Sequence, residues 1–449
     1  MTELVLKGRV VTASDIIDNG WIAVAGGKVS AVGTGGAPTA AETQDFGSAW
    51  LLPGAVDGQT HAGSQIGFPG MAPTTKAAVF GGVTTIVDMP YDHPIPVTKA
   101  PVLHEKVSAI QRYAVCDVAL YGTVPPRPDP ADIRGLIDLG VCAFKISSFE
   151  AHPDRFPRID NAATLTLLQA LEGTGLPLGL HNEDQEIVAH ATRTLKEAGR
   201  TGAEYHSQSR PPVAELAATG TFLELAASTE AHAHIVHISI PDGFEMVRTY
   251  RGRGRQVTAE MCVHYLLFDA ETDMPRLKGL LKVNPPIRPG QREALWQVLE
   301  DGLCSFVSSD HSAWPLERKT NASIFDVAAG MPGLEAMLPA FFTAAAKRKG
   351  DAQAALLTAD YLADRPARFF GLAGKGRIAP GFDADIAVLA ADHYIYDAKT
   401  NPDGPGWSAY DGMAFSVRPA ATFVRGRKVF DGVTVTETPG YGRYIARQR

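Results

Sequence analysis

Short apolar runs alternate with longer segments of mixed polarity through the middle of the chain. The longer segments, such as residues 161–175 and 213–230, carry apolar residues at helical spacing and predict amphipathic helices. Because strands of a helix-covered parallel sheet are buried on both faces, the alternation predicts an α/β protein with a (β/α)8 barrel of the TIM type. The apolar runs predict eight such strands, at residues 55–61, 83–89, 115–122, 142–147, 176–181, 233–239, 256–260 and 304–310.

The two ends of the chain show a different pattern, of short strands joined by tight turns. Gly26 and Gly27 supply the positive φ angles that a hairpin needs within the first fifty residues. The segments LVLKGRVV (4–11) and FVRGRKVF (423–430) look alike across nearly the whole chain length. We therefore expect both termini to build one small β-domain. The expected division of the chain is a β-domain of residues 1–53 and 376–449 on either side of a barrel of residues 54–375.

Composition and charge exclude several classes of protein. Of the 449 residues, 45% are hydrophobic and 20% are charged, which is ordinary for a globular protein. The net charge of −7 argues against nucleic acid and anionic membranes as partners, because both require clustered basic residues. The chain has no run of about 18 apolar residues that would predict a membrane span, and its start lacks the layout of a secretory signal. Four scattered cysteines without a Cys-x-x-Cys pair are typical of reduced thiols and favour a cytoplasmic location.

Five of the predicted strands end on residues that bind metals or move protons. A single histidine there is more often structural, and an aspartate often caps a helix. However, the C-terminal ends of barrel strands meet at one mouth, so the five side chains are expected to share a site. Three imidazoles, a carboxylate and an amine provide nitrogen and oxygen donors suited to Zn²⁺, and also to Mn²⁺, Co²⁺ or Ni²⁺. The five residues are His61, Lys145, His181, His237 and Asp310.

Lys145 requires its own explanation, because a protonated lysine would repel a metal. A neutral lysine amine takes up carbon dioxide and becomes a carbamate, which bridges two cations as a carboxylate does. The apolar residues before Lys145 in CAFKISS (142–148) favour the neutral form, since desolvation lowers the pKa of a lysine. On its own, a lysine that reaches solvent from a strand end is the simpler explanation.

Motifs along nearly the whole chain resemble those of the cyclic amidohydrolases, a branch of the amidohydrolase superfamily. This branch contains hydantoinase, dihydropyrimidinase, allantoinase and dihydroorotase. The resemblance implies a (β/α)8 barrel with a small β-sandwich domain formed by both chain termini. It also implies a metal-dependent hydrolase that opens the ring of a cyclic amide. The matching motifs are LLPGAVDGQTH (51–61), GGVTTIVDMP (81–90), AFKIS (143–147), LHNED (180–184), HIVHIS (234–239), AEMCVHYL (259–266), KVNPPIR (282–288), SSDHSAW (308–314), GLEAMLP (333–339) and GKGRIAPGFDADIAVL (374–389).

The same resemblance assigns roles to the strand-end residues. His61, His181 and His237 would bind one or two divalent metals, with zinc the first candidate and manganese or cobalt as alternatives. Lys145 would be carboxylated and would bridge them. Asp310 would be both a ligand and the general acid/base. It would accept a proton from the attacking water and return that proton to the leaving nitrogen.

The sequence departs from the family pattern at Gln59. The family places His-x-His at the end of the first strand, whereas this chain has Gln59-Thr60-His61. Because an amide oxygen is a weak ligand, the metal position that would use Gln59 is expected to bind its cation less tightly. The other position, made by Lys145, His181 and His237, is complete, so we expect activity to persist with one tight and one loose metal.

The substrate is predicted only as a class. Related dihydroorotases hold the substrate carboxylate with an arginine at the position of Gly63, which disfavours dihydroorotate. Hydantoinases and dihydropyrimidinases place a tyrosine at the position of Glu150. These differences favour an allantoinase-like enzyme or a hydrolase of another cyclic ureide, hydantoin, imide or lactam. Further candidates for contact with this small-molecule substrate are Phe149, Glu150, Arg155, Arg158, Cys262, Asn284 and Pro285, although an arginine on such a loop is usually only a solvated surface charge.

A catalytically inactive interaction protein on the dihydropyrimidinase fold is the competing hypothesis. It predicts little bound metal and no turnover. The collapsin response mediator proteins, which are inactive relatives, typically lose several metal ligands, whereas this chain lacks one. The family resemblance also implies a homotetramer or a homodimer.

Overall fold

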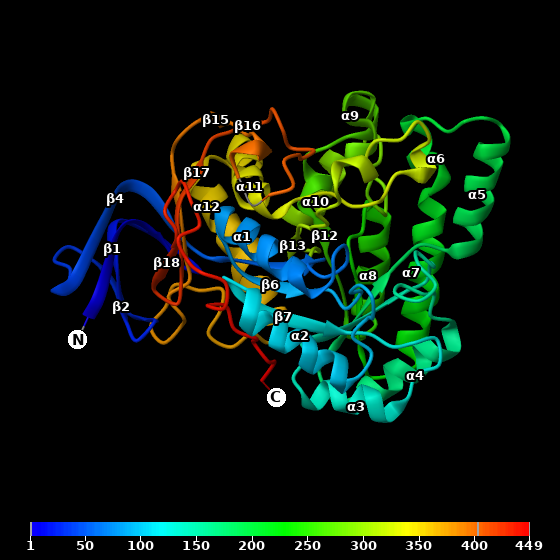
Figure 1. Ribbon diagram of the computed structural model, residues 1–449, viewed down its shortest axis with the longest axis horizontal. Helices are drawn as coiled ribbons and strands as arrows, with labels where there is room; N and C mark the ends of the chain where they lie inside the picture. The colour runs from blue at the N-terminus through cyan, green and yellow to red at the C-terminus, as the bar shows by residue number, and fades with distance from the viewer. Residues whose placement is uncertain (1, 402–403, 449) are drawn as a thin grey trace.

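The computed structural model describes residues 2–401 and 404–448, which form a barrel with a β-domain at its side (Figure 1). In the β-domain, strands from both ends of the chain join one seven-stranded sheet with the order β18-β17-β14-β4-β1-β2-β3. The expected hairpin at Gly26 and Gly27 joins β2 to β3, and β14 from the C-terminal part pairs with β4. The strands are β1 (Thr2–Val11), β2 (Ile16–Ala25), β3 (Lys28–Thr34), β4 (Ala40–Pro53), β14 (Ile386–Ala390), β17 (Arg418–Val424) and β18 (Arg427–Phe430).

The barrel contains the eight predicted strands in the predicted order. Seven neighbours form one parallel sheet, and the short last strand closes it by pairing with β12 on one side and by a bridge from His311 to Thr60 on the other. The seventh strand is interrupted at Glu260, which separates β11 from β12. The strands are β5 (Ala55–Thr60), β6 (Val83–Asp88), β7 (Asp117–Gly122), β8 (Ala143–Ser147), β9 (Pro177–His181), β10 (His232–Ile235), β11 (Val257–Ala259) with β12 (Met261–Cys262), and β13 (Val307–Ser308).

Helices follow each strand and cover the outside of the barrel. The segments expected to be helical at 161–175 and 213–230 form α4 and α7. Two further short strands, β15 (Tyr394–Ile395) and β16 (Ala414–Phe415), pair with each other near α11. The helices are α1 (Met71–Phe80), α2 (Ala100–Tyr113), α3 (Pro130–Asp138), α4 (Asn161–Leu171), α5 (Gln185–Glu197), α6 (His206–Ser209), α7 (Pro212–Ala227), α8 (Pro241–Gly252), α9 (Ala270–Leu277), α10 (Arg292–Glu300), α11 (Leu334–Lys349), α12 (Asp351–Ala359) and α13 (Arg365–Phe369).

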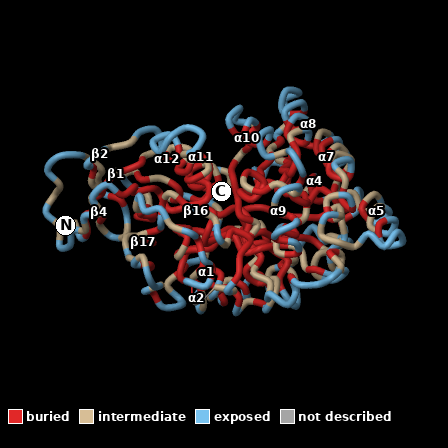
Figure 2. The backbone as a smooth tube through the Cα atoms, turned by 90° about the horizontal axis from the view of Figure 1, so that it is seen from above, coloured by how far each residue is buried: buried red, intermediate tan, exposed pale blue. Residues whose placement is uncertain are grey.

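Burial follows this architecture. The barrel strands and the inner faces of their helices are buried, whereas exposure concentrates on outer helices such as α5 and on the loops of the β-domain (Figure 2). Tyr121, Phe306 and Phe370 belong to a buried cluster that packs inside the barrel. Because the barrel interior is a packed core, the C-terminal ends of the strands are left as the place for a site.

The strands are shorter than the sequence predicts at two places that carry chemistry. The sixth strand ends at Ile235 and the eighth at Ser308, so His237 and Asp310 lie two residues beyond their strands. Both residues have left-handed backbone, with φ of 41° and 49°. A residue in this conformation leaves the strand ladder, which explains the early strand ends.

No helix within residues 2–401 and 404–448 is both long and apolar enough to span a membrane. The four cysteines are free and buried.

Candidate active site

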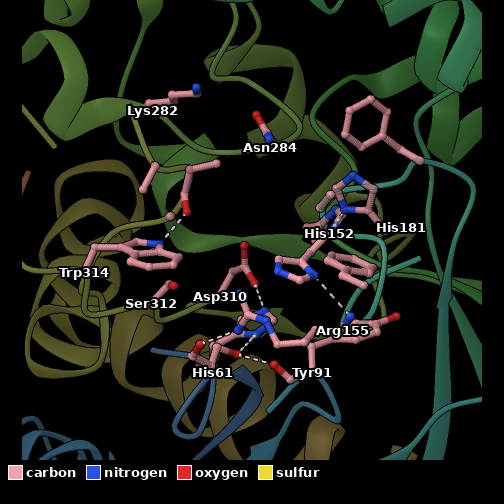
Figure 3. Close-up of a pocket in the computed structure, with 18 of the residues that line it drawn as sticks. His61, Tyr91, His152, Arg155, His181, Lys282, Asn284, Asp310, Ser312 and Trp314 are labelled. Carbon is pink, nitrogen blue, oxygen red and sulfur yellow. Dashed lines mark hydrogen bonds and ion pairs between the residues drawn. The ribbon is translucent and has the colours of Figure 1, made fainter. Parts of the chain in front are cut away.

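A cavity of about 450 Å³ opens at the C-terminal ends of the barrel strands. All five strand-end residues of the predicted site line it, and Asp310 lies at its centre (Figure 3). These residues come from five different strands: His61 follows β5, Lys145 is within β8, His181 ends β9, and His237 and Asp310 follow β10 and β13. The barrel therefore brings together side chains as far apart in the sequence as His61 and Asp310, which are 249 positions apart.

His181 and His237 face each other across this cavity. His181 Nδ1 lies 3.0 Å from His237 Nε2, and His181 Nε2 lies 2.9 Å from a carboxylate oxygen of Glu183. Burial raises the pKa of Glu183, but Arg210 and His181 outweigh it and lower the pKa to about 2. Because an ionised Glu183 only accepts, His181 Nε2 carries the hydrogen and Nδ1 presents a lone pair toward His237. A histidine oriented by a carboxylate in this way is typical of metal ligands.

Asp310 pairs with His61 at the same place. His61 Nε2 lies 3.3 Å from Asp310 Oδ1, and His61 Nδ1 lies 3.1 Å from Ser64 Oγ. Burial raises the pKa of Asp310, but His61, His237 and Lys145 outweigh it and hold the pKa well below its usual range. Asp310 therefore stays an anion within the cavity. Its left-handed backbone is the kind of strain that structures retain at functional positions.

Lys145 is buried, with 1% of its surface exposed, and burial lowers its pKa. Its Nζ donates a hydrogen bond of 2.9 Å to the side-chain oxygen of Gln59. The Gln59 amide in turn donates to Glu260, which also accepts from the His237 backbone nitrogen at 2.8 Å and from Ser308 Oγ at 2.8 Å. Burial raises the pKa of Glu260 to about 8. Gln59 is thus fully buried behind the cavity and links Lys145 to Glu260.

The donor set of the cavity suits a divalent cation. Two ligand atoms bound tetrahedrally to one zinc ion are about 3.3 Å apart, close to the separations of His181 from His237 and of His61 from Asp310. Without a metal, the facing nitrogens of His181 and His237 would share a single hydrogen. No carboxylate forms an ion pair with Lys145 within the described residues, so its amine is available for carboxylation.

A second group of carboxylates does not suit a metal. Asp117, Asp383 and Asp385 lie close together between the barrel and the β-domain. Lys375 Nζ lies 2.5, 3.0 and 2.8 Å from them, and Arg425 also binds Asp117. The lysine and the arginine already supply the positive charge that a cation would bring. We interpret this cluster as structural.

The predicted substrate contacts divide into two groups. Phe149, Glu150, Arg155 and Asn284 line the cavity. The other three lie outside its lining. Arg158 is at the surface in an ion pair with Glu186, Cys262 is buried with its Sγ 3.5 Å from Ser308 Oγ, and the Pro285 carbonyl accepts a hydrogen bond from Tyr265.

Several cavity residues were not expected from the sequence. Tyr91 and Phe156 stack with their rings 3.8 Å apart, and Phe156 meets the edge of His181. Trp314 lies on the other side of Asp310 (Figure 3), held by a hydrogen bond of 2.8 Å to the Ala329 carbonyl. Trp314 is the last residue of the motif SSDHSAW (308–314), Tyr91 directly follows the motif GGVTTIVDMP (81–90), and Phe156 lies on the loop after β8, so their place in the sequence is the one signal that could have indicated them. The other unexpected residues that line the cavity include Ser64, His152, Arg210, Lys282, Ser312 and Arg318.

Comparison with known proteins agrees with this geometry. The model of the amidohydrolase family matches residues 50–429. The chain is 34% identical to an allantoinase of Rubrobacter xylanophilus, over all of this chain and 98% of that protein. It is 29% identical to an L-hydantoinase of Paenarthrobacter aurescens, over all of this chain and 99% of that protein. The solved structure of an L-hydantoinase (dihydropyrimidinase) from Arthrobacter aurescens superposes with a TM-score of 0.93 at 28% identity, with all of both chains covered.

The fold and the site thus define a barrel of the metal-dependent hydrolase type. The chain belongs to the amidohydrolase family. The resemblance to the cyclic amidohydrolase branch that the motifs indicate is confirmed, as is the expected combination of a (β/α)8 barrel with a β-domain.

Proposed function

We propose that this protein is a metal-dependent hydrolase that opens the ring of a cyclic amide, with a reaction like that of the allantoinases and hydantoinases it resembles. The observation that carries the proposal is the convergence of His61, Lys145, His181, His237 and Asp310 in one cavity. Each is within reach of a neighbour in the set or of a residue that orients it. An interaction protein would have no need of so many buried titratable groups in a single pocket.

The metal would be held by His181 and His237 together with Lys145, and by His61 with Asp310. A bound divalent cation would supply acidified water and polarise the amide carbonyl. We propose zinc first, with manganese or cobalt as alternatives, and carboxylation of Lys145. Gln59 is engaged by Lys145 and Glu260, so the position next to it would bind a second metal weakly.

Asp310 would move the proton. Its carboxylate lies at the centre of the cavity, close to His61, and is exposed enough to meet a water molecule, with 14% of its side chain accessible. It would accept a proton from the attacking water and return it to the ring nitrogen as the carbon–nitrogen bond breaks. The ring nitrogen then leaves as a neutral amide or urea group.

The remaining walls would hold the ring. Tyr91 and Phe156 form an aromatic surface on one side, and Trp314 lies on another. Asn284 lines the cavity and its side-chain oxygen has no hydrogen-bond partner within the described residues. An unpaired buried amide is costly, so a ring N–H that donates to Asn284 would be favoured.

A panel of cyclic amides tests the proposal. The purified protein would be supplied with zinc, manganese or cobalt and bicarbonate, and ring opening of allantoin, hydantoins, dihydropyrimidines, cyclic imides and lactams would be followed by loss of ring absorbance or by chromatography. We expect turnover of at least one of the ureides or hydantoins. Absence of turnover with every metal and ring would favour the inactive interaction protein.

We propose a homodimer or homotetramer and a cytoplasmic enzyme, on the family resemblance and on the four free cysteines. Light scattering of the purified protein measures the assembly, and fractionation of source cells measures the location.

A further inference from the structure

One wall of the cavity carries three basic side chains that have no contact with the substrate in the proposed ring opening. We call Arg210, Lys282 and Arg318 the basic wall; all three line the cavity. The loop from Ala328 to Gly330 connects two of them, because Ala328 N donates to the Arg318 carbonyl and Gly330 N donates to the Lys282 carbonyl, both at 2.9 Å.

The segment that carries Arg210 contacts the segment that carries Lys282, because His206 Nε2, on the short helix α6 just before Arg210, lies 2.8 Å from the carbonyl oxygen of Val283. Burial and the charge of Arg210 lower the pKa of Lys282 to about 7. Figure 3 shows Lys282 on the Trp314 side of Asp310, and Arg318 packs over the Trp314 ring at 5.3 Å. Arg155 lies on the opposite side and is not part of the wall.

The basic wall has little counter-charge. Arg210 binds Glu183, and the charge of Asp326 acts to raise the pKa of Lys282, but neither Lys282 nor Arg318 forms an ion pair anywhere in the described part of the chain. The acidic residues that line the cavity are Glu150 and Asp310, and Asp310 is paired with His61. The chain as a whole has a net charge of −7. The surplus of positive charge in the cavity therefore reflects the local arrangement of these residues and not the composition of the chain. Such a cleft attracts anions.

Lys282 also has an unused hydrogen. Only 8% of its surface is exposed, and its ammonium donates to the carbonyls of Ile324 at 2.7 Å and Val327 at 2.6 Å. An ammonium has three donors, so one remains for the cavity. Lys319, by contrast, donates to three carbonyls and is fully used.

We propose that the basic wall binds a carboxylate on a side chain of the substrate, with Lys282 as the residue that contacts it. This inference rests on the proposed function and adds to it a substrate class, cyclic amides with an anionic substituent. A carboxylate would accept the unused hydrogen of Lys282 and would supply the missing charge. This carboxylate site does not involve residue 63. A Cβ at Gly63 would lie 1.9 Å from Asp92 Oδ1, so a side chain has no room there.

Two hydantoins of the same shape test the proposal. 5-(2-Carboxyethyl)hydantoin and 5-(2-carbamoylethyl)hydantoin differ only in a carboxylate against a carboxamide. In each, water adds to the ring carbonyl, the carbon–nitrogen bond breaks and the nitrogen takes the proton, which gives N-carbamoylglutamate or N-carbamoylglutamine. We expect kcat/KM to be about tenfold or more higher for the carboxylate at low ionic strength, and the preference to shrink as salt is added.

Substitutions in the basic wall test which residues give rise to the preference for the carboxylate. Lys282→Met should reduce the preference for the carboxylate about tenfold. Because Lys282 also holds two loop carbonyls, Arg318→Gln is the second variant, with an expected loss of about threefold. Arg134→Gln on α3, an exposed residue far from the cavity, removes the same charge and should leave the preference unchanged.

Calorimetry with the two products separates this inference from the proposed function, since binding needs no turnover. We expect N-carbamoylglutamate to bind about tenfold more tightly than N-carbamoylglutamine. Equal affinities, or a preference that survives both Lys282→Met and Arg318→Gln, would overturn the inference. Failure of every cyclic amide to react would overturn the proposed function, whereas equal turnover of the two hydantoins would overturn only the anionic subsite.

Discussion

The side-chain oxygen of Gln59 accepts a hydrogen bond of 2.9 Å from Lys145, while its amide donates to Glu260. The motif Gln59-Thr60-His61 predicts that Gln59 takes the place of a metal-binding histidine of the related enzymes. In this protein the residue orients the lysine and satisfies a buried carboxyl group. We therefore expect one strongly bound metal, at His181 and His237, and a second position weakened by Gln59.

Gln59→His should strengthen the second position. The imidazole would add a strong nitrogen donor beside Lys145 and Asp310, so bound metal should rise from about one toward two equivalents per chain. Mass spectrometry of the metal in dialysed protein measures this. Gln169→His, at an exposed position of α4, is the control for a nonspecific histidine effect. An unchanged stoichiometry and affinity in Gln59→His would count against a position near the metal for residue 59.

Asp310→Asn should lower kcat by a factor of about 10² to 10⁴, because the amide cannot take the proton from water. The fall should appear at saturating metal and substrate, with the unfolding temperature recorded to exclude loss of the fold. Asp154→Asn, an exposed change on the loop after β8, serves as the matched control. A kcat within threefold of the unchanged protein would remove Asp310 from the proposed proton transfer.

Gly63→Ala should lower both the unfolding temperature and the metal affinity. The new Cβ would lie 1.9 Å from Asp92 Oδ1, and Asp92 is itself held by Lys106 at 2.8 Å, so the turn that carries His61 must shift. Gly36→Ala is a fair comparison, since a Cβ there meets nothing within 4 Å. If both variants melt and bind zinc alike, the close packing at Gly63 does not position His61.

Lys375→Met should destabilise the protein by about 3–5 kcal/mol, because it leaves Asp117, Asp383 and Asp385 without their shared cation. Lys28→Met is the control. Lys28 pairs with Asp383 at 2.9 Å, but 54% of its side chain is exposed, and such pairs are worth at most about 1 kcal/mol. Denaturant unfolding measures both. Rescue of Lys375→Met by a divalent metal would instead show that the carboxylates form a cation site.

Much of the fold could be predicted from the sequence. The barrel strands are continuous apolar runs because they are buried on both faces. Their order around the barrel is their order along the chain. Their ends were less predictable. His237 and Asp310 leave the ladder through left-handed backbone that L-residues rarely adopt, and no local pattern marks such a conformation.

In the candidate site, too, some residues could be predicted from the sequence and others could not. The strand-end residues could be found because a barrel collects them at one mouth. The link from Gln59 to Glu260 joins residues 201 positions apart, and the pairing of Lys282 with loop carbonyls depends on a loop whose path the sequence does not reveal. Arg155 and Arg158 illustrate the limit, since two similar loop arginines lie respectively in the cavity and at the surface.

Metal reconstitution measures whether ring opening by this protein depends on a bound metal. The protein would be freed of metal with a chelator and titrated with zinc in the presence of bicarbonate, while bound metal and the ring-opening rate of a hydantoin or allantoin are measured on the same samples. We predict no turnover without metal and a rate that rises in proportion to bound zinc up to about one equivalent per chain. Full activity in the metal-free protein, or tight zinc binding with no ring opened, would contradict the account.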